Sequence, residues 1–132
     1  MYQCEYLTVK ETACKCCSQF RELTQQEIDW FLLVRTAVGE PMIIHRVFSC
    51  EKHNKEVGGA LRSPHLISSS FVAIDFHPQT IKILDCFYKL LNSGIGLRLG
   101  LYKGRLHVDN RLVRRLWLNV QGKNVYDTDT QV

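Results

Sequence analysis

No apolar run in the sequence approaches the roughly 18 residues needed to cross a bilayer, which excludes a transmembrane helix. A basic N-terminal segment followed by an apolar stretch is also missing, so no secretory signal peptide is visible. Internal repeats and low-complexity segments are absent as well. We therefore expect synthesis in the cytoplasm, with any release from the cell depending on another factor.

The apolar and charged fractions are those of a globular protein. Hydrophobic residues make up 45% of the chain and charged residues 23%, so enough apolar surface is present to offset chain entropy, and dominant disorder is excluded. At 132 residues the chain has room for one core of ordinary size. We expect a single domain over residues 1–132, whose polar end, from about residue 121, is frayed.

The charge bias is small, with 17 basic and 13 acidic residues giving a net charge of +4. Such a bias favours an anionic partner, a cell-wall polymer or a nucleic acid, without choosing between them. Arg111, Arg114 and Arg115 lie beside Trp117, a combination that can contact phosphate and stack on a base. The same stretch also fits an ordinary amphipathic segment, and we expect no nucleic-acid partner.

Six cysteines are present, and three of them lie within four residues: Cys14, Cys16 and Cys17. This cluster could bind zinc if Cys4 or Cys50 completed it, although structural zinc sites usually combine two spaced pairs of ligands. The other interpretation is a set of reduced, partly buried thiols. A disulfide framework would need an oxidising compartment, which no export signal supports.

Helical and extended segments are both predicted. Thr24 and Glu27 form a capping box in front of a helix over residues 25–38, and Gly39 ends that helix. A polar helical turn is expected over residues 50–57. A second helix is expected to open at Pro78 and to bury a face of four residues, Ile81, Leu84, Tyr88 and Leu91.

Strands are predicted over residues 42–48, 71–76, 95–102 and 105–109, with a last short strand at residues 117–118. Lys103 and Gly104 form a two-residue hairpin turn between the third and fourth of these strands. The fold class is therefore α+β, a mostly antiparallel sheet flanked by helices.

Two of the five histidines lie in a context that suits metal binding. His65 lies in a turn upstream of the strand that contains Asp75, while His107 and Asp109 share one face of the hairpin strand. Two imidazoles and a carboxylate can hold Zn²⁺ and leave a fourth position for water. For the other three histidines, His45, His53 and His77, surface or structural roles are expected.

Seven short motifs follow one another along the chain in a specific order and spacing. The first three are residues 6–16 with aromatic, acidic and cysteine residues, Gly39-Glu40-Pro41 before an apolar strand, and His53-Asn54 followed by Val57-Gly58-Gly59-Ala60. The other four are Ser63-Pro64-His65-Leu66, Ala73-Ile74-Asp75-Phe76, Gly94-Ile95-Gly96, and His107-Val108-Asp109-Asn110-Arg111. Together they resemble the family of zinc D-Ala-D-Ala carboxypeptidases, peptidoglycan peptidases whose fold is shared with hedgehog signalling domains.

The resemblance implies a hedgehog/D-Ala-D-Ala peptidase-like fold and a zinc ion bound by His65, Asp75 and His107. Asp109 is then a candidate proton acceptor, or a partner that orients a zinc ligand. The arginine that the family uses for the substrate carboxylate corresponds to Ser49, so Arg46 or Arg62 must bind that group from another direction.

Two further departures from the family pattern concern the site. The segment between His65 and Asp75 is longer by about three residues, with Ser68-Ser69-Ser70 in its middle. In addition, some relatives have an acidic residue three positions before the second histidine, and this position is Gly104 here.

We expect a zinc-dependent carboxypeptidase or endopeptidase of peptidoglycan stem peptides, such as a phage or prophage lysis enzyme. The alternative is a catalytically impaired module that binds wall peptides or proteins.

Overall fold

The computed structural model describes residues 1–127 and contains a six-stranded sheet with the order β3-β4-β6-β5-β7-β8. Its strands are β3 (Met42–Arg46), β4 (Ala73–Pro78), β5 (Arg98–Tyr102), β6 (Arg105–Asp109), β7 (Arg115–Val120) and β8 (Lys123–Tyr126). All neighbours are antiparallel except β5 and β7, which are parallel. The expected class, α+β with a mostly antiparallel sheet, is confirmed.

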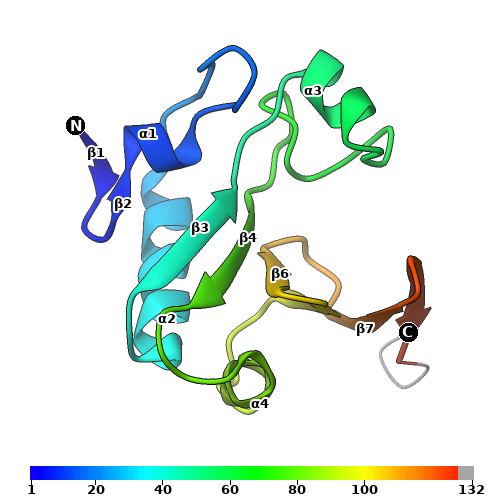
Figure 1. The fold of residues 1–132 in the computed structure, drawn as a ribbon. Coiled ribbons are helices and arrows are strands. Elements are labelled where there is room, and N and C mark those ends of the chain that lie inside the picture. The colour runs from blue at the N-terminus through cyan, green and yellow to red at the C-terminus, as the bar shows by residue number, and fades with distance from the viewer. Residues whose placement is uncertain (128–132) are drawn as a thin grey trace.

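Two longer helices, α2 (Gln25–Val38) and α4 (Ile83–Leu91), pack beside the sheet (Figure 1). A small N-terminal unit contains β1 (Tyr2–Cys4), β2 (Leu7–Thr8) and α1 (Val9–Thr12), and α3 (Glu51–Glu56) follows β3. Among the described residues, no helix is long and apolar enough to pass through a bilayer.

Helix α2 follows the prediction closely. Thr24 and Glu27 form the expected capping box, and Gly39 closes the helix with φ of 79°, a left-handed conformation that glycine adopts without strain. Phe31 and Val34 face the core and are buried. Local capping signals therefore define both ends of this helix.

Helix α4 differs from the prediction. Pro78 is the last residue of β4 and opens no helix, and the helix begins at Ile83. The reason is tertiary: the carboxylate of Glu40 accepts hydrogen bonds from the backbone of Thr80 and Ile81, which holds this segment as a turn. The buried face is also different, because Cys86, Phe87 and Leu90 are buried while Leu84 and Tyr88 are half exposed.

The C-terminal segment also differs from the expected frayed tail. The strand expected at residues 117–118 spans Arg115–Val120, and it pairs with β8 through a turn at Gln121 and Gly122. Residues 128–132, the end of the predicted tail, lie outside the described residues.

The two faces of the central strands have different roles. Along β4 and β6, Ile74, Phe76, Leu106 and Val108 are packed into the apolar core with α2 and α4. Because successive side chains of a strand point to opposite faces, the residues between them face away from these helices. That second face carries Asp75 and His107, which are also register partners.

Candidate metal and substrate site

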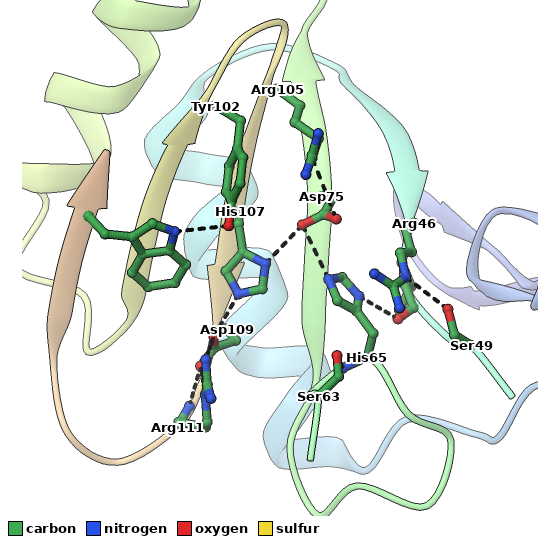
Figure 2. Close-up of polar contacts among 12 residues, drawn as sticks. Arg46, Ser49, Ser63, His65, Asp75, Tyr102, Arg105, His107, Asp109 and Arg111 are labelled. Carbon is green, nitrogen blue, oxygen red and sulfur yellow. Dashed lines mark hydrogen bonds and ion pairs between the residues drawn. The ribbon is translucent and has the colours of Figure 1, made fainter. Parts of the chain in front are cut away.

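Three groups from separate parts of the chain meet on this open face of the sheet (Figure 2). Asp75 lies on β4, His107 lies opposite it on β6, and His65 comes from the loop between α3 and β4. One ligand atom of each of them lies within 4.8 Å of the others, and all three residues are buried. The structure therefore brings together the three residues that the sequence selected as metal ligands.

The longer loop does not displace His65, because two backbone hydrogen bonds to Ser49 hold it. The Ser49 N–H donates to the carbonyl of His65 at 2.9 Å, and the Ile67 N–H donates to the carbonyl of Ser49 at 3.1 Å. Ser49, which the resemblance placed at the position of the family's arginine, is completely buried. The added serines of the loop line a neighbouring hollow instead, together with Arg111.

The tautomer of His65 follows from its contacts. Its Nδ1 atom lies 2.9 Å from the carbonyl oxygen of Val47, which can only accept, so Nδ1 carries the proton. The Nε2 atom is buried and has no hydrogen-bond partner among the described residues, although it faces Oδ1 of Asp75 at 3.2 Å. A lone pair opposite a carboxylate oxygen is repulsive unless a cation lies between them.

The distance between His65 and Asp75 fits a metal shell. Ligand atoms about 2.0–2.1 Å from a tetrahedral Zn²⁺ would lie about 3.3 Å apart. The separation of 3.2 Å between His65 Nε2 and Asp75 Oδ1 matches this value, whereas Nδ1 of His107 lies 2.8 Å from the same oxygen, a hydrogen-bond distance that an ion would lengthen. The donor set of two imidazoles and one carboxylate is also one that zinc accepts.

His107 is held from its other side by Asp109. The Nε2 atom of His107 lies 2.7 Å from Oδ2 of Asp109, which also accepts a hydrogen bond of 2.8 Å from Arg111. Asp109 is completely buried. With Nε2 donating to Asp109, a metal ion that displaced the Nδ1 proton would meet the lone pair of that atom on the side of Asp75 and His65.

Burial and the neighbouring charged groups shift the pKa values of His65, His107 and Asp75. Burial lowers the pKa of His65 and favours its neutral form. Burial acts in the same direction on His107, but its hydrogen bonds to Asp109 and Asp75 raise its pKa above the ordinary value. Burial alone would raise the pKa of Asp75, yet the two histidines hold it well below its usual range, so this carboxylate stays ionised.

The three groups open into a hollow of about 440 Å³ that is rich in arginine. Five guanidinium groups line it, those of Arg46, Arg62, Arg98, Arg105 and Arg111, and Asp75 is the only carboxylate among the described residues that do so. This lining favours a substrate that carries negative charge near the metal ligands.

Arg46 reaches the hollow because of a bulge in β3. The register between β3 and β4 shifts between Ile44 and Arg46, so that Arg46 pairs with Asp75. Its Nε donates to the Ser49 hydroxyl at 2.8 Å, and its Nη2 donates to Oδ1 of Asn54 at 2.8 Å. Arg62 also lines the hollow, although its side chain is exposed. Both candidate carboxylate-binding residues thus lie at the site.

The sequence did not select several residues that line the hollow, among them Arg98, Tyr102, Arg105 and Trp117. Arg105 lies 3.8 Å from Oδ2 of Asp75 and stacks on Tyr102 at 4.2 Å. The strand period could have identified it, because Arg105, His107 and Asp109 alternate on one face of β6. No local pattern identifies Trp117, because it reaches the site only through the parallel pairing of β7 with β5.

Two of the remaining histidines lie elsewhere. His45 and His77 form a pair at 2.6 Å on the β3–β4 edge, and neither lines the hollow. In the basic stretch considered for nucleic acid, Arg111 is bonded to Asp109, Arg114 donates to the carbonyl of Leu91, and Arg115 stacks on Tyr126.

Comparison with known families agrees with the motifs. A family model described as Peptidase M15 matches residues 3–109, which includes all three metal-ligand candidates and Asp109. The chain therefore belongs to the peptidase M15 family, the zinc D-Ala-D-Ala carboxypeptidase-type family. Neither the curated proteins nor the solved structures give a significant match. Membership in a family that is usually zinc-dependent supports peptidase activity.

Proposed function

We propose that this chain is a zinc peptidase that hydrolyses peptidoglycan stem peptides, as a D-Ala-D-Ala carboxypeptidase or an endopeptidase. The convergence of His65, Asp75 and His107 on one buried point beside an arginine-rich hollow is the observation that carries this proposal. A bound zinc ion would lower the pKa of a water molecule and polarise the scissile carbonyl.

The protein groups divide the remaining work. His65, Asp75 and His107 would hold the ion, and Asp109 would keep His107 in the tautomer that offers Nδ1. Arg46 would bind the terminal carboxylate of the peptide, with Arg62 as a second, more exposed cation that lines the hollow. Because Asp109 is completely buried behind His107, we assign it a positioning role rather than direct proton transfer.

A non-catalytic module that binds wall peptides or proteins is the second candidate. It is favoured by one feature: the position of the acidic residue found in some relatives is Gly104, which lies in the β5–β6 turn with φ of 81°. Asp75 is then the only carboxylate at the described lining, and as a zinc ligand it would be a poor general base.

Incubation of the zinc-loaded protein with a stem pentapeptide separates these functions. Mass spectrometry should detect free D-Ala from a carboxypeptidase or an internal cleavage from an endopeptidase. His65→Ala and His107→Ala should abolish both turnover and binding of zinc at this site, whereas His53→Ala, outside the hollow, should leave both unchanged. Peptide binding without cleavage would favour the module, and full activity of both variants would refute the site.

A further inference from the structure

Four thiols gather at a second place, away from the arginine-rich hollow. Cys14, Cys16 and Cys17 lie in the loop after α1, and Cys50 lies between β3 and α3, two segments that run side by side (Figure 1). Their sulfur atoms all lie within 4.8 Å of one another, and all four residues are free cysteines. Cys50 is more than 30 residues away from the other three cysteines in the sequence, and the fold brings it to them. We call these four residues the thiol cluster.

The spacing of the sulfur atoms has a specific meaning. Cys14 and Cys16 are separated by 3.6 Å, Cys16 and Cys50 by 3.4 Å, and Cys14 and Cys50 by 3.8 Å. Four thiolates about 2.3 Å from a tetrahedral Zn²⁺ would lie about 3.8 Å apart. Three sulfur–sulfur separations are thus close to the edges of a zinc–thiolate tetrahedron.

We propose that the thiol cluster of Cys14, Cys16, Cys17 and Cys50 binds a structural zinc ion, distinct from the ion at the histidine site. Soft thiolate ligands in a closed set of four select zinc over the harder divalent cations. This proposal does not depend on peptidase activity, since none of the four cysteines lines the arginine-rich hollow.

Backbone groups around the cluster are arranged to support thiolate charge. The N–H of Cys50 donates to the sulfur of Cys14 at 3.4 Å, and the N–H of His53 donates to the sulfur of Cys50 at 3.4 Å. The loop also closes on itself, because the Cys14 carbonyl accepts from Ser18 and the Cys14 N–H donates to Gln19, both at 2.8 Å. Such a turn presents several sulfur atoms to one point.

The position of the cluster explains what the ion would do. Between Ala13 and Thr24 the chain forms no helix or strand, and its order depends on a few turn and side-chain hydrogen bonds. Zinc binding would fasten it to the start of α3, the short helix that carries Asn54. Asn54 accepts a hydrogen bond from the guanidinium of Arg46, which lines the hollow. The ion would therefore also stabilise one side of the hollow.

Metal content of the full-length protein tests the proposal. The double variant His65→Ala/His107→Ala, purified under reducing conditions with zinc present, should retain about one zinc ion per chain, and X-ray absorption should show sulfur ligands near 2.3 Å. Wild-type protein should contain one ion more, with a mixed sulfur and nitrogen or oxygen shell. A wild-type spectrum without sulfur scatterers would overturn the proposal, whether or not the double variant folds.

Cysteine variants give a matched comparison. Cys16→Ser and Cys50→Ser should each lose the sulfur-bound ion while the histidine site still loads, and Cys4→Ser, outside the cluster, should keep both ions. In the wild-type protein the four thiols should resist iodoacetamide until a chelator is added. Rapid alkylation of all four without chelator, two intramolecular disulfides, or iron in place of zinc would each contradict the assignment.

Discussion

The Nε2 atom of His107 lies 2.7 Å from the Oδ2 atom of Asp109, and the carboxylate behind this imidazole is completely buried. Arg111 closes the arrangement with hydrogen bonds to both oxygens of Asp109. Although burial alone would raise it, the contacts with His107 and Arg111 hold the pKa of Asp109 at about 2. This carboxylate therefore stays ionised at neutral pH, where it can hold and polarise His107.

Replacing this charge should weaken zinc binding without removing any ligand. We expect Asp109→Asn to lower zinc affinity at the histidine site by about 10- to 100-fold, because His107 loses the partner that fixes its tautomer. Competition with a chromophoric chelator measures the affinity, and Asp85→Asn on the exposed side of α4 is the control. Unchanged affinity in Asp109→Asn would contradict the positioning role.

Arg46 should matter for substrates with a free carboxylate. A charge-assisted hydrogen bond contributes about 1.5–3 kcal/mol, so Arg46→Gln should raise KM about 10- to 100-fold. The wild-type protein should show a similar loss with a C-terminally amidated peptide, and the variant should show no additional loss with it. If the variant still discriminates between acid and amide, Arg62 is the better candidate.

A side chain at position 100 should destabilise the protein, because Trp117 packs directly over Gly100. A Cβ atom at Gly100 would lie 2.3 Å from the Trp117 indole, which stands 5.2 Å from the His107 ring and donates to the Tyr102 hydroxyl. Gly100→Ala should lower the free energy of unfolding by about 1–3 kcal/mol. Gly96→Ala is the matched control, since nothing lies within 4 Å of its added carbon. Urea denaturation of both variants checks this prediction.

Glu27 should contribute stability that depends on pH. Burial alone would raise its pKa, but hydrogen bonds from Arg21 at 2.7 Å and from the Thr24 backbone hold that pKa below the ordinary value. A carboxyl group whose folded pKa is depressed stabilises fully above its unfolded pKa, about 4.3, and loses this contribution as pH falls through the folded pKa.

We therefore expect Glu27→Gln to lower the free energy of unfolding at pH 7 by about 1–3 kcal/mol. The difference between wild type and variant should shrink as the pH falls below about 4. Glu22→Gln, on an exposed side chain, should change little at either pH. A difference that stays constant down to strong acid would show that the ion pair is not its source.

Where the structure is local in origin, the sequence was sufficient. The capping box at Thr24, the glycine stop at Gly39 and the turn at Lys103 and Gly104 involve only residues close in the chain. Strand alternation also placed His107 and Asp109 on one face. The start of α4 could not be found in this way, because the carboxylate of Glu40, about forty residues away, holds the backbone that precedes it.

The sequence by itself determined which residue types carry the chemistry: two histidines and an aspartate in motifs of one peptidase family, and three cysteines within four residues. Only the tertiary structure decided how they combine. A bulge in β3 brings Arg46 opposite Asp75, and the segment between β3 and α3 brings Cys50 to the cysteines of the N-terminal loop. The physical reason is that strand register and the path of the chain set the distances between residues that are far apart in the sequence. A pattern within a few neighbouring residues carries no information about these distances.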